Sequence, residues 1–208
     1  MRPLVVTMFL TMDGVVQAPG GPGEDPAGGF AYEGWLVPHF DEDLGEQIEE
    51  WFTSAEDFLL GRGTYDIFHA SWPKMRDESS AVSTGLNDKV KHVASRTLTA
   101  VEWDTARLIE GDVAEAVRAL KASDGGELQV HGSPGLVQTL LREDLVDELR
   151  LVVFPVTLGP GKRLFGEGTV PRTWRLTASK VTGSGALIAT YQRAGEVEVG
   201  SMGPEYEE

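Results

Sequence analysis

The sequence predicts an α/β fold in which a central, mostly parallel sheet is flanked by helices and extended by a C-terminal antiparallel hairpin. Apolar runs of strand length alternate with segments whose apolar residues recur at helical spacing, as in strand–helix–strand units. Turns rich in glycine, proline and serine separate these segments. Near the C-terminus, two strand-like segments flank residues 183–185, a Gly-Ser-Gly turn that indicates a closing hairpin.

The first sixty residues contain two expected strands and one helix. Residues 4–11 are an apolar strand, and residues 57–60 are a second one. Between them, residues 17–34 are rich in glycine and proline and form a long loop, which in a compact domain is usually functional or disordered. Residues 41–55 carry apolar residues at helical spacing and form an amphipathic helix with Asp41 as its N-cap.

The middle of the chain continues the alternation more weakly. We expect a helix near residues 64–69 and a short strand at residues 91–95. Residues 71–88 are a polar stretch to which the pattern assigns no element. Trp103 and residues 108–109 are weaker strand candidates.

The second half has the clearest pattern. A helix over residues 112–122 precedes a strand at 127–131, and a further helix covers 134–142. Ser133 is expected to be the N-cap of that last helix, and Pro134 suits its first position.

The remaining elements close the domain. A long strand at residues 147–156 leads into a turn at 157–161, and the hairpin consists of strands at 174–182 and 186–193. One domain therefore spans residues 1–193. Residues 194–208 form an acidic tail with five glutamates and no basic residue, which we expect to be solvated or disordered.

Composition excludes several classes of function. The formal net charge of −15 argues against a general nucleic-acid or anionic-membrane surface. The chain has no cysteine, so it has no disulfide or thiolate site, and its four scattered histidines argue against zinc. No apolar run reaches the roughly 18 residues of a membrane span, and the N-terminus is typical of a strand rather than a signal peptide. We expect a cytoplasmic protein.

The turn Gly61-Arg62-Gly63-Thr64 points to phosphate binding. A strand runs into it and a helix leaves it, so free backbone N–H groups lie beside a guanidinium. Two later sites, Ser95-Arg96 and Gly132-Ser133, combine the same kinds of residue after a strand. The repetition indicates an anionic cofactor, although each turn taken alone is also typical of a plain connection.

In order and spacing, these motifs resemble the reductase domain of bifunctional riboflavin-biosynthesis deaminase-reductases, a relative of dihydrofolate reductase. The resemblance covers about residues 3–193. It rests on Thr11-Met12-Asp13-Gly14, Gly61-Arg62-Gly63-Thr64, Ser95-Arg96-Thr97, Val130-His131-Gly132-Ser133-Pro134-Gly135 and the segments 145–151 and 155–165. The zinc-binding motifs of the deaminase half are absent, so the chain looks like a stand-alone reductase.

The resemblance implies a dihydrofolate-reductase-like fold that binds NADPH. Ser95 and Arg96 would hold the adenosine 2′-phosphate, which favours NADPH over NADH. The cofactor-binding positions that the resemblance implies are Gly61, Arg62, Thr64, Ser95, Arg96, Gly132, Ser133, Gly135, Leu158 and Gly159. Alternatives stay open: Arg96 as a solvated surface arginine, residues 132–135 as a plain helix start, and residues 158–161 as an ordinary turn.

The resemblance also implies substrate-side residues. Asp13 is the candidate catalytic and substrate-orienting group, or else the anchor of its own turn. Trp35 packs on a planar substrate or on the core. Lys162 and Arg163 bind a substrate phosphate or are surface cations. No metal is expected.

The implied activity is hydride transfer from NADPH to a small heterocyclic or ribosylamino-pyrimidine substrate, as in 5-amino-6-(5-phosphoribosylamino)uracil reductase. The alternatives are an orphan reductase of another small molecule and a non-catalytic, dimeric nucleotide-binding protein of the same fold. The resemblance implies a homodimer, in which the strand at 147–156 is either an interface or core. Folate reduction is disfavoured because none of Asp41, Glu42 and Glu46 matches the acid that binds the pterin.

Overall fold

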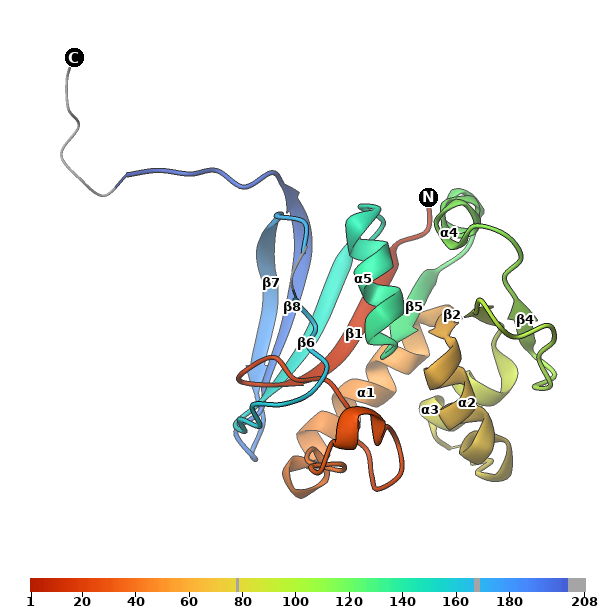
Figure 1. Cartoon of the computed structure of the whole chain (residues 1–208), viewed down its shortest axis with the longest axis horizontal. Helices are drawn as coiled ribbons and strands as arrows, with labels where there is room; N and C mark the ends of the chain where they lie inside the picture. Colours follow the sequence, from red (N-terminus) through yellow and green to blue (C-terminus); the bar gives the residue numbers. More distant parts are fainter. Residues whose placement is uncertain (78, 167–168, 202–208) are drawn as a thin grey trace, which may run out of the picture.

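The computed structural model describes residues 1–77, 79–166 and 169–201. These residues build one eight-stranded sheet of order β4-β3-β2-β5-β1-β6-β8-β7 (Figure 1). The strands are β1 (Leu4–Thr11), β2 (Ala55–Gly61), β3 (Lys91–Ala94), β4 (Ala106–Leu108), β5 (Glu127–His131), β6 (Glu148–Phe154), β7 (Thr173–Val181) and β8 (Leu187–Gly195). The α-helices are α1 (Glu42–Ser54), α2 (Arg62–Ser71), α3 (Ala81–Asp88), α4 (Val113–Ala122) and α5 (Pro134–Arg142). Short 3₁₀ helices lie at Ala27–Gly29, Val37–His39 and Trp72–Lys74.

The sheet is parallel from β4 to β6 and antiparallel at its C-terminal edge. β1 pairs in parallel with β5 and β6, whereas β8 runs antiparallel to both β6 and β7. The predicted fold class, with its closing hairpin, is therefore confirmed. β1 is nearly continuous apolar sequence because both of its faces are covered.

Two layers of helices enclose the sheet. One face of β1, with Leu4, Val6 and Met8, packs in a core cluster with residues of α4 and α5. The opposite face packs against α1, whose Leu44 and Trp51 are buried. Figure 1 shows α5 in front of the sheet and α1 behind it. The apolar stripe predicted for residues 41–55 thus forms the buried face of α1, and Asp41 caps it by accepting from Leu44 N–H at 3.0 Å.

Helix α3 lies in the stretch to which the sequence pattern assigned no element. Its residues are weak helix formers, because serine, threonine, glycine and asparagine dominate it. Tertiary contacts compensate: Leu86 is fully buried, Ser80 caps the helix, and Glu49 of α1 accepts from Ser80 Oγ at 2.8 Å. Of the two weaker strand candidates, residues 108–109 overlap β4, whereas Trp103 is a buried residue just before it.

The C-terminal part differs from expectation in small ways. β6 lies between β1 and β8 and is mostly buried, so the strand predicted at 147–156 packs in the core. β8 extends to Gly195, two residues past the expected end of the domain. Residues 196–201 leave the body of the molecule (Figure 1), and residues 202–208 of the expected acidic tail lie outside the described residues. Within the described part of the chain, no helix has the length and apolarity that crossing a bilayer requires.

Candidate functional site

A large cleft opens where the parallel strands end. Its volume is about 2100 Å³, and it is lined at the ends of β2, β3 and β5 by Gly61, Ser95 and Gly132. The helices α2, α4 and α5 begin at the same edge. In open α/β sheets this edge is the usual ligand site, and drug-sized ligands occupy roughly 300–1,000 Å³. The cleft therefore has room for a dinucleotide together with a second small molecule.

The cleft reaches into the sheet because two neighbouring strands separate. The last residues that β1 and β5 pair in register are Thr7 and His131. β1 continues along β6 to Thr11, whereas the chain after β5 turns away at Gly132 with a φ of 68°. A Cβ at Gly132 would lie 3.3 Å from Thr64 Oγ1, in addition to the unfavourable φ. Glycine at this position is therefore required by the turn.

Ser133 joins the starts of α2 and α5 instead of capping its own helix. Its Oγ accepts from Gly61 N–H at 2.8 Å and donates to Thr64 Oγ1 at 2.6 Å. Its backbone is left-handed, with φ 59°, and its side chain makes no capping bond. The predicted N-cap position is confirmed, but the predicted capping role of the side chain is wrong because the hydroxyl is engaged across the cleft floor.

The two helix N-termini are consequently free to bind an anion. α1, α3 and α4 are capped by Asp41, Ser80 and Asp112, whereas no side chain caps α2 or α5. The first-turn N–H groups of a helix have no partner within the helix and carry partial positive charge. Gly61 must be glycine here, because a Cβ would lie 2.8 Å from the Ser133 side chain.

Three predicted arginine and serine positions lie in the same cleft. Ser95 Oγ accepts from the N–H groups of Thr97 and Leu98 and so shapes the turn after β3. Arg96 lines the cleft, is exposed, and has no hydrogen bond or ion pair within the described part of the chain. The Arg62 guanidinium already has protein partners, because it forms an ion pair with Asp66 at 3.3 Å and donates to Thr97 Oγ1. Arg96 is therefore the more available cation.

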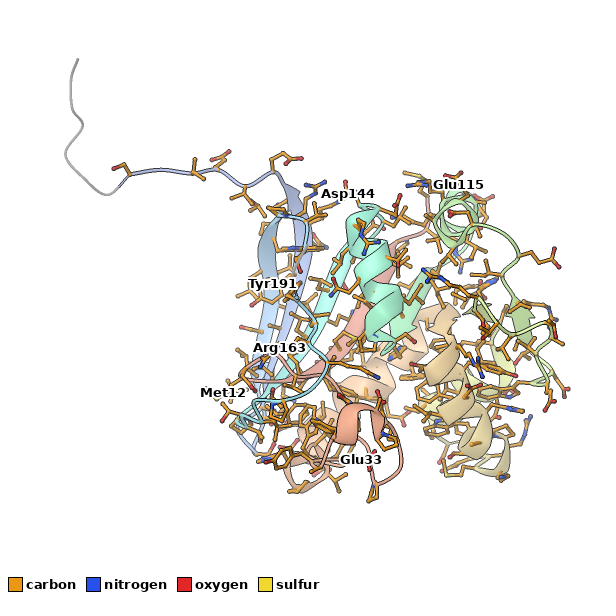
Figure 2. The ribbon with its side chains drawn as sticks, in the orientation of Figure 1. Met12, Glu33, Glu115, Asp144, Arg163 and Tyr191 are labelled. Carbon is orange, nitrogen blue, oxygen red and sulfur yellow. The ribbon has the colours of Figure 1, made fainter. Side chains whose placement is uncertain are left out.

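Asp13 does not line the cleft; its carboxylate anchors a turn. It accepts from Thr11 Oγ1 at 2.6 Å and from the N–H groups of Leu158 and Gly159, and Arg163 lies 3.4 Å away. The hydrogen bond from Thr11, opposed by desolvation and aided by the two backbone donors, lowers the pKa of Asp13 to about 2. Figure 2 shows Arg163 close to Met12, on the side of the molecule away from Glu115 of α4.

The remaining predicted residues divide between the cleft and the core. Thr64 and Gly135 line the cleft with their neighbours. Leu158 and Gly159 are absent from its lining and instead hold Asp13. Trp35 is also outside it: the indole is buried, donates to Gln17 O at 2.8 Å and packs on Phe154. Lys162 lines the cleft, but its ammonium is paired with Asp25.

One end of the cleft lies against β1 and α1 and is here called the inner end. The sequence analysis did not predict it. Its residues are Thr7, Phe9, Ile48, Trp51, Phe52 and His131. One signal was available, because Thr7 is the single polar residue in the run Leu4–Leu10. The aromatic side chains gave no such signal, since their helical spacing is equally typical of a core stripe.

His131 is a neutral group in this inner end. Its ring lies 4.4 Å from that of Phe52, and its Nε2 is 2.9 Å from Gln129 Oε1. Burial, reinforced by the positive charge of Arg150, lowers the pKa of His131 to about 3. Near neutral pH it therefore contributes a polar but uncharged surface.

The acids of α1 are engaged elsewhere. Asp41, Glu42 and Glu46 do not line the cleft, and Asp41 also accepts from Ser184 N–H at 2.7 Å. Glu49 does line it, but its carboxylate binds the start of α3. No group of three or more histidine, aspartate or glutamate side chains in the described ranges is arranged to hold a metal ion.

Comparisons with known proteins agree with this architecture. The chain is 26% identical over 192 residues to the uncharacterized protein YyaP of Bacillus subtilis (strain 168), covering 91% of this chain and 94% of YyaP. A crystal structure from Shewanella sp. PV-4, of a protein provisionally named as a riboflavin biosynthesis protein, superposes with a TM-score of 0.71 at 22% identity, covering 93% and 99% of the two chains.

Two further solved structures share this fold. A deaminase and 5-amino-6-(5-phosphoribosylamino)uracil reductase from Thermotoga maritima superposes with a TM-score of 0.62 at 15% identity, over 93% of this chain and 57% of that one. Dihydrofolate reductase from Enterococcus faecalis, complexed with NADP(H), gives 0.58 at 16% identity, over 92% and 96%. The family model of the RibD C-terminal domain matches residues 2–188, and the chain belongs to that family.

Proposed function

We propose that this protein is an NADPH-dependent reductase that transfers hydride to a small nitrogen heterocycle of the ribosylamino-pyrimidine type. One observation carries the proposal: two uncapped helix N-termini and an unpaired arginine, Arg96, converge on one cleft whose inner end is apolar. Such a cleft suits a polyanionic dinucleotide at one end and a planar ring at the other. The family and the reductase-like neighbours support the same class of reaction.

The residues present fit the cofactor. The α2 and α5 N-termini would bind its pyrophosphate, with Gly61 and Gly132 allowing close backbone approach. Ser95 and Arg96 would bind the 2′-phosphate of the adenosine. When bound, the nicotinamide supplies the hydride, and the protein supplies position and exclusion of water. The apolar walls of Phe9, Ile48 and Phe52 would exclude water from the reacting ring.

The revised role of Asp13 follows from its contacts. With a pKa of about 2 it is ionised at neutral pH, and its carboxylate oxygens accept hydrogen bonds from Thr11 Oγ1 and Gly159 N–H. We therefore propose that Asp13 holds residues 158–159 in place instead of donating a proton.

A second candidate keeps the reaction but drops the substrate phosphate. The cations expected to bind that phosphate are paired, Lys162 with Asp25 and Arg163 with Asp13. This pairing favours an unphosphorylated heterocycle as substrate. Activity on a phosphorylated and a dephosphorylated form of the same ribosylamino-pyrimidine distinguishes the two candidates.

The proposal is tested by binding of NADPH and NADH to the wild type and to Arg96→Ala. At a hundredfold its dissociation constant a ligand stabilises the fold by about 2.7 kcal/mol, or roughly 5–11 °C for a chain of this size. We expect this shift with NADPH, and a loss of affinity of about tenfold or more in Arg96→Ala. NADH should bind both forms alike.

The matched control is Arg175→Ala, which removes the same charge from β7 outside the cleft and should leave NADPH affinity unchanged. No stabilisation of the wild type by saturating NADPH would contradict the cofactor assignment. Binding without oxidation of NADPH by any heterocycle tested would favour a non-catalytic nucleotide-binding protein.

We further propose a homodimer. Because β6 is buried between β1 and β8, the contact would use the hairpin β7–β8 instead of the strand predicted at 147–156. Three large apolar side chains of this hairpin are exposed: Leu176, Val181 and Leu187.

A further inference from the structure

Thr7 holds a buried hydroxyl that nothing in the described chain satisfies. The residue is 3% exposed, and its Oγ1 has no hydrogen-bond partner among the described residues. Valine has nearly the same shape and would fill the position without a polar atom. A buried hydroxyl without a partner is unfavourable, so its presence in an otherwise apolar strand needs a reason.

The position of Thr7 supplies that reason. It lines the cleft at the point where β1 and β5 separate, and it is paired in register with His131. Thr7 therefore lies at the floor of the inner end of the cleft. Phe9, on the same strand face, and Phe52, which contacts His131, bound the same space.

We propose that the hydroxyl of Thr7 hydrogen bonds to the amide-type edge of a planar ring bound at the inner end of the cleft. The inference rests on the proposed function, and it adds a positioning residue that the sequence motifs did not identify. Aromatic walls favour a planar ring, and one hydroxyl among them fixes the ring's orientation. His131 is neutral, and its Nε2 is already hydrogen bonded to Gln129, so we assign this role to Thr7 and not to His131.

Two rings carry the required chemistry. One is the carboxamide of the nicotinamide, and the other is the carbonyl and N–H edge of a pyrimidine substrate. Both place an amide-type donor and acceptor on the rim of a flat ring, so the structure assigns the shared chemistry and the experiment separates the sources.

A structural explanation competes with this one. Arg150, paired in register with Thr7 on β6, also has a buried nitrogen, Nη1, without a hydrogen-bond partner in the described ranges. A buried water that bridges the two groups would satisfy both. In that case loss of the hydroxyl would lower stability and leave ligand binding unchanged.

The test compares the wild type with Thr7→Val and Thr7→Ser. Dissociation constants are measured for NADPH and for adenosine 2′,5′-bisphosphate, which lacks the nicotinamide, and KM and kcat for 5-amino-6-(5-phosphoribosylamino)uracil. If Thr7 binds the carboxamide, Thr7→Val weakens NADPH about 5- to 30-fold and leaves the bisphosphate unchanged. If Thr7 binds the substrate ring, Thr7→Val leaves NADPH affinity unchanged and raises the KM for the pyrimidine substrate by a similar factor. Thr7→Ser should return either value to within about twofold, because it keeps the hydroxyl.

The controls keep this inference separate from the proposed function. Thr177→Val, an exposed position on β7 outside the cleft, should change none of these constants. If the wild type binds NADPH and Thr7→Val binds it equally with an unchanged KM, the Thr7 inference is overturned and the proposed function stands. If the wild type does not reduce the pyrimidine, the comparison of NADPH affinity between the wild type and Thr7→Val alone tests the Thr7 inference. If the wild type does not bind NADPH, both fail together.

Discussion

At the scale of single residues, His131 links the chemistry of the cleft to the stability of the fold. The folded protein keeps its imidazole neutral down to a pKa of about 3, because the ring is buried and faces the positive charge of Arg150. In the unfolded chain the same group has an ordinary pKa near 6.5. Below pH 6.5 the imidazole of His131 is therefore protonated in the unfolded state but stays neutral in the folded state.

The sign of the pH effect follows. The contribution of His131 is fully present above about pH 6.5 and is lost as pH falls toward 3, by up to about 1.4 kcal/mol per pH unit. Burial also lowers the pKa of His92, which acts in the same direction. Asp13, with its pKa near 2, contributes only below pH 4. Between pH 6.5 and 4.5 the two histidines therefore lower the stability as pH falls, whereas Glu24, whose pKa is raised by burial, acts in the opposite direction.

We predict that His131→Gln reduces this pH dependence. Urea unfolding at several pH values between 7 and 4.5 measures it, since the free energy of unfolding should fall less steeply in the variant than in the wild type. The variant keeps an amide next to Gln129 and is expected to fold. Equal slopes for the two proteins would mean that the imidazole is solvated and protonated in the folded state.

Residue roles were predictable from the sequence only where they depend on near neighbours. Asp41 caps the helix that it precedes, and Gly132 provides the positive φ of its own turn. The partners of Ser133 and Asp13, by contrast, lie 72 and about 145 residues away along the chain. A local pattern identified both as special but could not show that one bridges two helices and the other anchors a distant turn.

At the scale of elements, α3 shows how a helix forms against its own propensities. Glu49 of α1 accepts from Ser80 Oγ and from Ala81 N–H, so a carboxylate lies at the N-terminus of α3, where it is favoured. The two helices are held together at the edge of the cleft, which Glu49, Ser80 and Val82 line.

We predict that Glu49→Gln destabilises the protein by about 1–2 kcal/mol, because hydrogen bonds to a charged acceptor are lost at a helix start. Amide hydrogen exchange should show the loss concentrated in α3. Glu50→Gln is the matched control, since Glu50 is exposed and accepts a hydrogen bond from Gln47 Nε2 on the same helix; it should change stability by less than about 0.5 kcal/mol. Equal effects of the two substitutions would show that Glu49 does not anchor α3.

Helices and strands were predicted correctly where burial of one face gives the apolar residues a clear repeat or a continuous run. α5 was placed with its observed bounds, and β1 and α4 were placed to within one residue, because each has one long apolar stripe or run. α3 was missed because its stability comes from Glu49 and from the burial of Leu86, neither of which its own composition shows. The inner end of the cleft was missed for a related reason: it forms only when β1, β5 and α1 are brought together.

At the scale of the whole molecule, the closing hairpin is the least covered part of the sheet. Val181 pairs in register with Leu187, and Leu176 with Tyr191, so these four side chains lie on one face of β7 and β8. Leu176 and Val181 are 51% and 66% exposed. Figure 2 labels Tyr191 on this hairpin, beside the part of the sheet that α5 covers. An apolar face of this kind marks an interaction surface more often than a solvated one.

We predict that the wild type is a dimer in solution and that Leu176→Glu combined with Val181→Glu converts it to a monomer, since burying two unpaired carboxylates is strongly unfavourable. Light scattering coupled to size-exclusion chromatography measures the mass directly. Val37→Glu, which adds one acid at an exposed apolar position outside β7 and β8, should leave the dimer intact. A monomeric wild type, or a double variant that stays dimeric, would rule out this face as the contact. NADPH binding should survive in the monomer, because Gly61, Ser95, Arg96 and Gly132, which would bind the cofactor, all line the cleft of one chain.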